Sequence, residues 1–276
     1  MNDFKKYTLT VEEDKKEIVL AFLSLLNCDM IEEHDAGFSL SFELNNDFDQ
    51  SKIEFLAVID RFNIDYKEEI VKAQNWNAVW ESSFQPIFVG DYAQIRASFH
   101  EPKSDYKHDL LIDPQMSFGT GHHATTYMMV DMMSTLDFNA KEVMDYGCGT
   151  GILAILAAKE GAEKVLAFDI EENAYENSLS NVGTNNVENV TVFQGILDQV
   201  ESNMKFDYIL ANINRNVILN SLERLATHLV KGGKLLISGI LEKDVKLIVE
   251  KASEAGFDQV KMNTREGWVC YLFTCN

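Results

Sequence analysis

A glycine-rich turn between two apolar runs constrains this chain more than any other stretch. The run 143–145 predicts the end of a short buried strand, and Gly147-Cys148-Gly149-Thr150-Gly151 follows it directly. Glycine has no Cβ, so the backbone of such a turn can approach a ligand closely. The Ala-rich run 152–159 predicts a helix, and 165–168 predicts a second buried strand that ends at Asp169. This order is typical of half a nucleotide-binding α/β unit, in which the acid accepts hydrogen bonds from a ribose.

The spacing of the glycines separates two kinds of adenosine ligand. A dinucleotide site favours G-x-G-x-x-G, whose helix start receives a pyrophosphate. Here the pattern is G-x-G-x-G, Ile152 occupies the place of the third glycine, and Asp145 precedes the turn by two residues. The pattern resembles motif I of the class I S-adenosylmethionine (SAM) methyltransferases, whose ligand carries no phosphate. A tight turn in another doubly wound enzyme, an NAD-dependent oxidoreductase for example, remains the alternative, and the spacing opposes it.

Net charge limits the partners. The 276 residues carry a formal charge of −20, which repels phosphate backbones and disfavours strong nucleic-acid binding. The same field attracts a basic partner. Residues 1–85 and 86–276 each contribute −10, so the first stretch has about twice the charge density and suggests a separate acidic module. We expect a cytoplasmic protein without membrane contact, because the start of the chain lacks a signal-peptide pattern and the longest apolar run, 18–26, is too short to span a bilayer.

The first 66 residues predict a small α+β domain of ferredoxin-like order, β-α-β-β-α-β. Its first helix, within 14–27, is predicted to bury Ile18, Phe22, Leu25 and Leu26. A linker helix is predicted over 67–84, because Trp76, Trp80 and Phe84 recur every four residues and share one face. That face is either packed against a neighbouring domain or a hinge that docks substrate.

Residues 85–276 predict a Rossmann-like, doubly wound sheet. Further buried strands are predicted over 190–194, 206–210 and 234–238, each followed or preceded by a helix. The runs 258–264 and 268–274 predict an antiparallel pair around Arg265-Glu266-Gly267. A parallel sheet that closes with an antiparallel hairpin resembles the ending of class I methyltransferases.

The stretch DLLIDPQMSFGTGHHATT, from Asp109, concentrates polar side chains before a predicted helix. His122 and His123 are adjacent and would point in different directions on a helix, so no metal site is expected. Thr125 and Thr126 could cap the helix. They could instead place a hydroxyl over the glycine turn.

These stretches together resemble one family, the PrmA-type methyltransferases of large-subunit ribosomal protein eleven. The matching segments are DPQMSFGTGHHATT, VMDYGCGTGILAI, AFDI, ANINRN and GWVCYLF, and the likeness is specific from about Trp76 onward. Two departures stand out: the family's GTGTHPTT is GTGHHATT here, and its N-I-L after the fourth strand is N-I-N, which ends at Asn214. The resemblance implies that SAM contacts four residues: Thr126, Gly147, Asp169 and Asn212. We also expect Asp145, Gly149 and Gly151, in and before the glycine turn, to contribute to the cofactor site.

The resemblance also implies the reaction, transfer of the SAM methyl group to lysine or N-terminal amines of a basic ribosomal protein. Asn212 is the expected catalytic residue, because its carbonyl oxygen can accept an N–H from the amine. His122 or His123 is expected to assist in removing the proton. The alternative is a SAM-dependent N-methyltransferase that acts on another protein, on glutamine or on a nucleobase nitrogen. Methyltransferases of adenine or glutamine nitrogens usually show N-P-P-[YF] at the position of Asn212, and its absence here argues against the glutamine and nucleobase versions. A binding protein that merely retains the fold is a further alternative. We expect a monomer that acts on the protein free of the ribosome.

Overall fold

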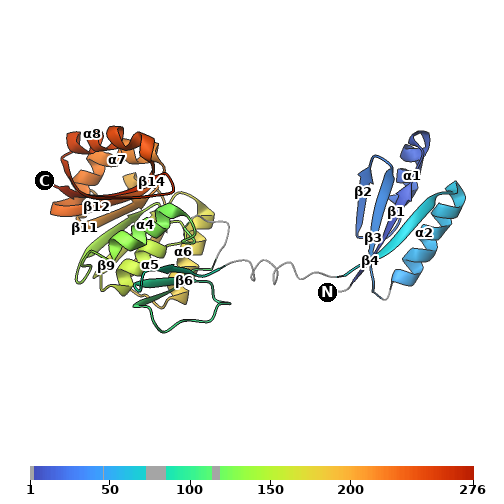
Figure 1. The fold of residues 1–276 in the computed structure, drawn as a ribbon, viewed down its shortest axis with the longest axis horizontal. Helices are drawn as coiled ribbons and strands as arrows, with labels where there is room; N and C mark the ends of the chain where they lie inside the picture. The colour runs from blue at the N-terminus through green and yellow to red at the C-terminus, as the bar shows by residue number, and fades with distance from the viewer. Residues whose placement is uncertain (1–2, 46, 73–84, 114–118) are drawn as a thin grey trace. The chain divides into compact units, whose positions relative to one another are not determined.

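The computed structural model describes residues 3–45, 47–72, 85–113 and 119–276. The contacts between residues divide the chain into two units, Met1–Phe84 and Gln85–Asn276. Each unit has its own hydrophobic core and is described by itself (Figure 1).

The N-terminal unit packs two helices against one face of an antiparallel sheet. Its sheet has the order β2-β3-β1-β4. Tyr7 and Leu9 of β1 and Phe38 and Leu40 of β3 are fully buried. They alternate with residues that are not all fully buried, because successive side chains of a strand point to opposite faces of the sheet. In chain order the elements are β1 (Phe4–Thr10), η1 (Glu13–Lys15), α1 (Lys16–Leu23), β2 (Met30–His34), β3 (Gly37–Glu43), α2 (Phe48–Phe62) and β4 (Asp65–Val71).

The buried stripe predicted for the first helix is confirmed only in part, since Phe22 and Leu26 pack against the core but Ile18 and Leu25 are exposed. Val19 and Leu23 are the buried positions of this helix, whereas Ile18 is 52% exposed and Leu25 is 80% exposed. A short helix with apolar residues nearly all round has no single stripe that periodicity can select, so the position of the sheet decides which face is buried.

The boundary predicted at residue 66 falls inside a strand. β4 continues to Val71 and pairs along its whole length with β1, from Thr10↔Asp65 to Phe4↔Val71. Residues 67–71 are therefore strand, where the sequence predicted the start of a linker helix. Every residue of β4 is exposed, so this edge strand carries no buried apolar face for periodicity to detect. The remainder of the predicted helix, with Trp76 and Trp80, lies outside the described residues.

The C-terminal unit is built on a seven-stranded sheet of order β10-β9-β8-β11-β12-β14-β13. The first five strands are parallel, whereas β14 runs antiparallel to both β12 and β13. This arrangement confirms the predicted Rossmann-like sheet. Its strands are β8 (Glu142–Tyr146), β9 (Lys164–Asp169), β10 (Val190–Gln194), β11 (Phe206–Asn212), β12 (Leu229–Leu241), β13 (Phe257–Arg265) and β14 (Trp268–Cys275).

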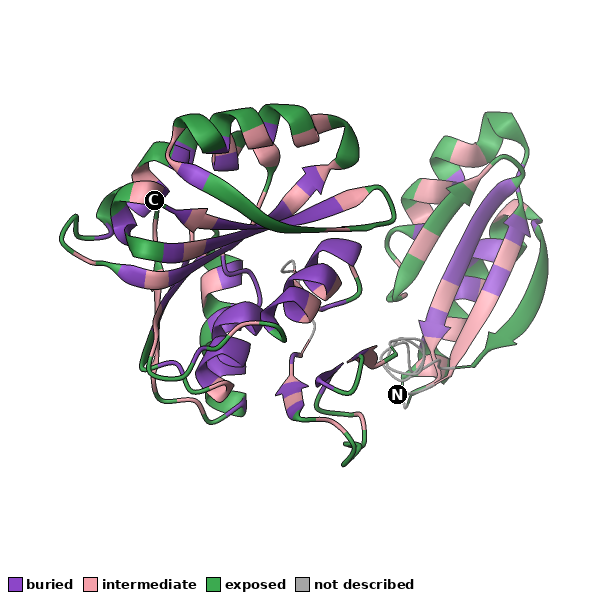
Figure 2. Ribbon diagram, turned by 60° about the vertical axis from the view of Figure 1, so that its left-hand side comes forward, coloured by how far each residue is buried: buried purple, intermediate pink, exposed green. Residues whose placement is uncertain are grey.

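Helices cover both faces of this sheet. One face packs against α4, α5 and α6, and the opposite face packs against α7 and α8 (Figure 1). Neighbouring residues of a central strand serve opposite cores, as Val143 and Met144 of β8 do. Buried residues run through nearly all of α5, which lies within the molecule (Figure 2). The helices are α4 (Ala124–Met133), α5 (Ile152–Lys159), α6 (Glu172–Thr184), α7 (Arg215–His228) and α8 (Val245–Glu254), with short turns η2 (Leu197–Gln199) and η3 (Glu242–Asp244).

A small three-stranded sheet leads into the main sheet. It consists of β5 (Ile87–Val89), β6 (Ala93–Arg96) and β7 (His108–Leu111). β5 and β6 form an antiparallel hairpin around Gly90-Asp91. β7 packs against α5, and its chain then continues toward α4.

Candidate active site

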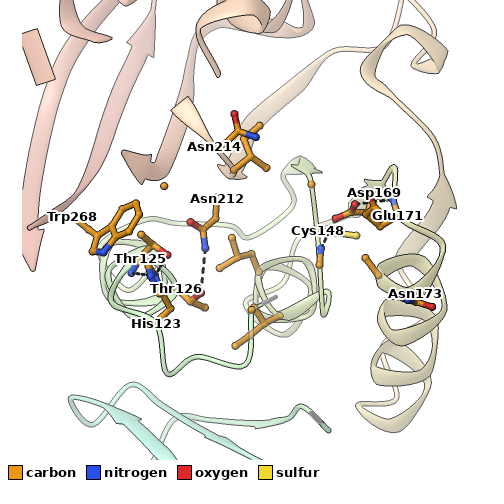
Figure 3. A pocket seen from close by; sticks show the side chains of 18 residues that line it. His123, Thr125, Thr126, Cys148, Asp169, Glu171, Asn173, Asn212, Asn214 and Trp268 are labelled. Atoms are coloured by element: carbon orange, nitrogen blue, oxygen red, sulfur yellow. Dashed lines mark hydrogen bonds between the residues drawn. The ribbon is translucent and has the colours of Figure 1, made fainter. Parts of the chain in front are cut away.

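A cavity of about 480 Å³ opens at the carboxyl ends of β8, β9 and β11. This edge of a doubly wound sheet is where such folds bind ligands. α4 and the start of β14 complete its wall (Figure 3). The residues that line it are Gly119, His123, Thr125, Thr126, Gly147, Cys148, Gly149, Ile152, Leu153, Asp169, Glu171, Asn173, Ala174, Asn212, Ile213, Asn214, Gly239 and Trp268.

The glycine turn forms the floor of the cavity, and its glycines serve different neighbours. Gly147 has φ +74°, and a Cβ there would collide with Ile213, which follows β11. Gly151 has φ +78° and precedes α5; a Cβ on it would lie 2.6 Å from Ser178 Oγ of α6. Gly147 and Gly149, two of the predicted cofactor contacts, line the cavity, whereas Gly151 does not line it and permits α6 to pack closely.

Asp169 ends β9 and reaches back to the glycine turn. Its Oδ2 accepts a hydrogen bond from Gly149 N at 3.0 Å, and its Oδ1 accepts one from Glu171 N at 3.1 Å. These two bonds fix the carboxylate at the wall of the cavity (Figure 3). A carboxylate oxygen has two lone pairs, so each oxygen can still accept a hydrogen bond from a ligand.

Asp145 lies behind the glycine turn and does not line the cavity. It is fully buried, and its Oδ2 accepts a hydrogen bond from Ala154 N in the first turn of α5. Burial, together with the negative charge of Asp169, raises the pKa of Asp145 to about 7. The Ala154 N–H in the first turn of α5 is thus already bonded to Asp145 and is not available to a phosphate at this helix start.

Asn212 and Thr126 meet at the other end of the cavity. Asn212 ends β11, and its Nδ2 donates a hydrogen bond to Thr126 Oγ1 of α4 at 3.2 Å (Figure 3). Thr126 is fully buried. The Oδ1 of Asn212 is buried, and no group within the described residues donates to it. A buried acceptor of this kind is costly unless a ligand supplies the donor. In the structure Nδ2, and not Oδ1, faces Thr126 Oγ1, which therefore accepts.

His123 lines the cavity as the cap of α4. Its Nδ1 accepts a hydrogen bond from Thr125 N at 3.3 Å and contacts Thr125 Oγ1 at 2.8 Å. A ring nitrogen that accepts from a backbone N–H is unprotonated, so the neutral ring carries its proton on Nε2. In this tautomer His123 has no free nitrogen with which to take a proton from an amine.

His122 does not line the cavity. Its Nδ1 lies 3.2 Å from Thr120 Oγ1, and its Nε2 lies 3.0 Å from the carbonyl oxygen of Gln85. The carbonyl can only accept, so Nε2 is the donor. His122, one of the departures from GTGTHPTT, therefore connects the loop 119–121 to Gln85, the first residue of the C-terminal unit.

Several residues of the cavity wall were not predicted from the sequence, and Trp268 and Gly239 are two of them. Trp268 begins β14, and its ring meets His123 edge-on with centroids 4.9 Å apart. Only the distant pairing of β14 brings it here, so no local pattern marks it. Gly239 lies inside β12 with φ +88°, where a Cβ would collide with the Ile213 carbonyl oxygen. An isolated glycine within the run KLLISGIL was the available signal, since glycine inside a strand often marks a bulge or close approach.

Asn214, the second departure from the family pattern, has a structural role. It caps α7, and its side-chain oxygen accepts a hydrogen bond from Val217 N at 3.1 Å. Among the described residues, no group of three or more His, Cys, Asp or Glu side chains could hold a metal ion. In the same part of the chain, no helix is long and apolar enough to cross a membrane.

Comparison with known proteins bears directly on this site. The family model described as ribosomal protein L11 methyltransferase (PrmA) matches residues 26–275. The chain belongs to this family. It is accordingly a SAM-dependent methyltransferase.

Individual relatives agree with the family assignment. The ribosomal protein L11 methyltransferase of Phocaeicola vulgatus is 39% identical over 213 residues, which are 76% of this chain and 75% of the relative. That of Chlorobaculum parvum is 33% identical over 275 residues, 95% of this chain and 93% of the relative. The crystal structure of ribosomal protein L11 methylase from Lactobacillus delbrueckii subsp. bulgaricus is 26% identical, with a TM-score of 0.65 over 70% of this chain and 100% of that chain.

Proposed function

We propose that this methyltransferase transfers the methyl group of SAM to amino groups of ribosomal protein L11. The substrate is the one that the relatives' names give. The observation that carries the chemistry is the buried Oδ1 of Asn212, an acceptor at the cavity with no donor within the described residues. An incoming amine would supply that donor.

The cavity residues fit SAM at two points. Asp169 retains acceptor capacity for a ribose diol, and Gly147 and Gly149 let the backbone approach a ligand closely. Asp145 already accepts from Ala154 N in the first turn of α5, so this N–H cannot bind a pyrophosphate, which argues against the dinucleotide alternative. SAM supplies a methyl group that is already activated by its sulfonium. The protein then has to align, desolvate and orient the amine.

Asn212 would orient the amine through Oδ1. Because Nδ2 is held by Thr126 Oγ1, the amide plane is fixed before the substrate arrives. An amide cannot act as a base near neutral pH, so it positions the nitrogen lone pair without taking the proton. A lysine amine has a pKa of about 10.4, and the neutral fraction at pH 7.4 is about one in a thousand. We propose that the amine loses its proton to solvent, since His123 has its Nδ1 occupied.

The N-terminal unit is proposed as the substrate-binding module. Its element order β-α-β-β-α-β and sheet order β2-β3-β1-β4 support a ferredoxin-like domain. Its acidic charge density suits a basic ribosomal protein. The antiparallel β13–β14 pair supports the class I methyltransferase ending for the C-terminal unit. We propose that the enzyme acts as a monomer in the cytoplasm, on L11 free of the ribosome.

The test is methylation of purified L11 with SAM labelled in its methyl group, followed by mass spectrometry of the modified residues. We expect label on lysine side chains or the N-terminal amine of L11, and none with Asn212→Ala on the same time scale. A truncated chain starting at Gln85 should still bind SAM but should not methylate L11. Purified L11 that stays unlabelled, although the enzyme binds SAM, or label on its glutamine side chains would contradict the proposed substrate and acceptor group.

A further inference from the structure

Two chain segments that flank residues 114–118 are each bonded to the region of the glycine turn. β7 ends at Leu111, and Asp113 is the last described residue before this stretch. Gly119, the first described residue after it, lines the cavity. Residues 114–118 themselves lie outside the described residues.

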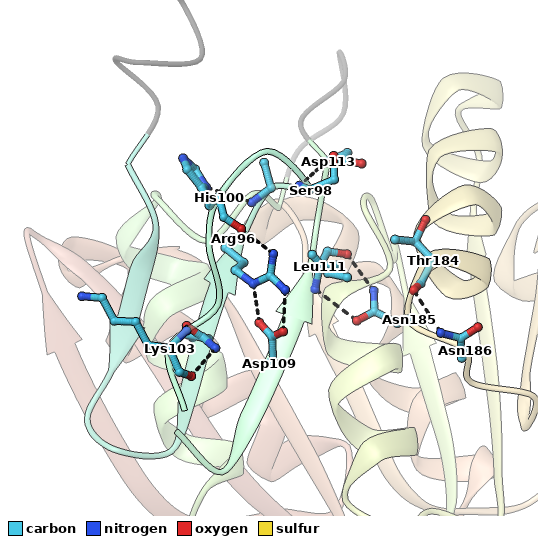
Figure 4. Close-up of polar contacts among 12 residues, drawn as sticks. Arg96, Ser98, His100, Lys103, Asp109, Leu111, Asp113, Thr184, Asn185 and Asn186 are labelled. Atoms are coloured by element: carbon cyan, nitrogen blue, oxygen red, sulfur yellow. Dashed lines mark hydrogen bonds and ion pairs between the residues drawn. The ribbon is translucent and has the colours of Figure 1, made fainter. Parts of the chain in front are cut away.

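The first flank is held by side chains of α6. Asn185, which follows α6, binds both backbone groups of Leu111: its Oδ1 accepts from Leu111 N at 3.1 Å and its Nδ2 donates to Leu111 O at 2.6 Å (Figure 4). The Asn185 amide thus makes the two hydrogen bonds with Leu111 that the backbone of a neighbouring strand would otherwise make. Ser98 N also donates to Asp113 Oδ1, at 2.6 Å, and fixes that side chain (Figure 4).

Asn181 connects the first flank to the glycine turn. It is 1% exposed. Its Oδ1 accepts a hydrogen bond from Asp113 N at 3.2 Å, and its Nδ2 donates to the carbonyl oxygen of Thr150 at 2.9 Å. The remaining Nδ2 hydrogen is directed to Asn177 Oδ1 at 3.1 Å. Both ends of this one amide are thus occupied by backbone from two separate segments.

Thr150 holds the second flank. Its Oγ1 donates a hydrogen bond to the carbonyl oxygen of Gly119 at 2.8 Å. Thr150 is fully buried and does not line the cavity. The fit is close, because a Cβ on Gly119 would lie 2.9 Å from this Oγ1, and Gly119 has φ +107°.

We infer that Thr150 and Asn181 are positioning residues for cofactor binding. Neither touches the cavity, yet together they fasten Asp113 and Gly119 to the same turn that carries Gly147 and Gly149. The wall at Gly119 and the glycine floor therefore keep a fixed spacing. This inference rests on the proposal that SAM occupies the cavity between them.

The sharpest test is Thr150→Val, which keeps the shape of the side chain and removes only the hydroxyl. Loss of one buried hydrogen bond should raise the Kd for SAM by about 3- to 10-fold, measured by calorimetry well below the unfolding temperature. We expect the KM for SAM to rise by a similar factor, with kcat at saturating SAM lowered by less than the change in KM. Thr150→Ser restores the hydroxyl and should return the affinity to within about twofold of the wild type.

Thr184→Val is the matched control. The Thr184 hydroxyl donates to Ser180 O within α6 and is exposed, so it makes no link between the turn and Gly119. Its removal should leave the Kd unchanged. Asn181→Ala provides the second arm and should weaken SAM binding at least as much as Thr150→Val, because it releases Asp113 N and Thr150 O together.

Three outcomes would overturn the inference. One is an unchanged Kd in folded Thr150→Val when the wild type binds SAM. Another is a Thr150→Ser protein that stays as weak as Thr150→Val, which would assign the effect to packing. The third is a wild-type chain that does not bind SAM at all, which would remove the proposed function as well.

Discussion

The two ends of the cavity hold their polar side chains in different ways. At one end the carboxylate of Asp169 already accepts hydrogen bonds from Gly149 N and Glu171 N, and Asp145 adds a second carboxyl group behind it. At the other end stands a neutral pair, Asn212 and Thr126, in which Nδ2 is bonded and Oδ1 is not bonded within the described residues. The first end is electrostatically negative and its geometry is fixed; the second is neutral and has an acceptor to spare.

This difference separates holding a ligand from orienting a reactant. A ribose diol needs a fixed acceptor that is the same before and after reaction, which suits Asp169. An amine that gains a methyl group changes its hydrogen bonds during the reaction, which suits the spare acceptor of Asn212. The comparison therefore predicts that mutations at the two ends will change different kinetic constants.

The largest effect is expected from Asn212→Ala. Loss of a positioned polar group should raise the activation free energy of L11 methylation by about 2–4 kcal/mol and lower kcat accordingly, with a smaller change in SAM affinity. Steady-state kinetics and calorimetry on the same preparation check both numbers. A variant whose defect is confined to SAM affinity would make the two ends alike and assign Asn212 to cofactor binding.

The pH dependence of the rate tests the neutrality of the Asn212 end. If no group there takes the proton, the neutral amine is the nucleophile, and kcat/KM for a lysine target should rise by up to about tenfold per pH unit between pH 7 and 9. Steady-state rates measured across this pH range provide the test. A flat profile, with the chemical step shown to limit the rate, would place a general base at this end.

Asp169→Ala tests the opposite end. Two charge-assisted hydrogen bonds to the ribose would be lost, so the SAM affinity should fall by about 2 kcal/mol or more. The kcat at saturating SAM should change far less than in Asn212→Ala. Calorimetry that finds wild-type affinity in a folded variant would remove Asp169 from the binding site.

The buried carboxyl of Asp145, at the negative end of the cavity, should make the protein's free energy of unfolding depend on pH. Its folded pKa of about 7 lies above the ordinary value of 3.8, so the folded chain retains a proton that the unfolded chain has lost. Stability should fall as pH rises from 5.5 to 8, by about 2 kcal/mol relative to Asp145→Asn. Urea denaturation of both proteins at several pH values measures this difference. Parallel curves for the two would show that Asp145 ionises as it does in the unfolded chain.

The smallest effect is expected from Thr126→Val. It removes the acceptor for Asn212 Nδ2 and releases the amide to rotate. The activation free energy should rise by about 1 kcal/mol, which lowers kcat. Thr126→Ser is the control that keeps the hydroxyl. Equal rates for Thr126→Val and the wild type would mean that the amide is oriented without this contact.

The sequence was most informative where the structure is local. The glycine turn, the strand ends at Asp169 and Asn212, and the helix that carries Thr126 follow from patterns a few residues long, and all of these lie at one cavity. Trp268 could not be placed, because its position depends on the antiparallel pairing of β14 with β12. Gly239 carried a local signal, an isolated glycine within a strand run, but its neighbour Ile213 follows a different strand. His122, predicted beside the reaction, lies away from the cavity and binds the Gln85 carbonyl, which is a contact across 37 residues. The strand β4 was cut short because its charged, wholly exposed residues give no periodic signal.

The place of β14 in the sheet has a consequence for biosynthesis. This strand, Trp268–Cys275, lies between β12 and β13, so the sheet of the C-terminal unit stays incomplete until these residues have left the ribosome. The N-terminal unit ends at Phe84 and can fold earlier. At about 5–20 residues per second, the roughly 190 residues that follow take about 10–40 s to synthesise. A nascent chain would thus display a folded acidic module well before it has a cavity closed by Trp268.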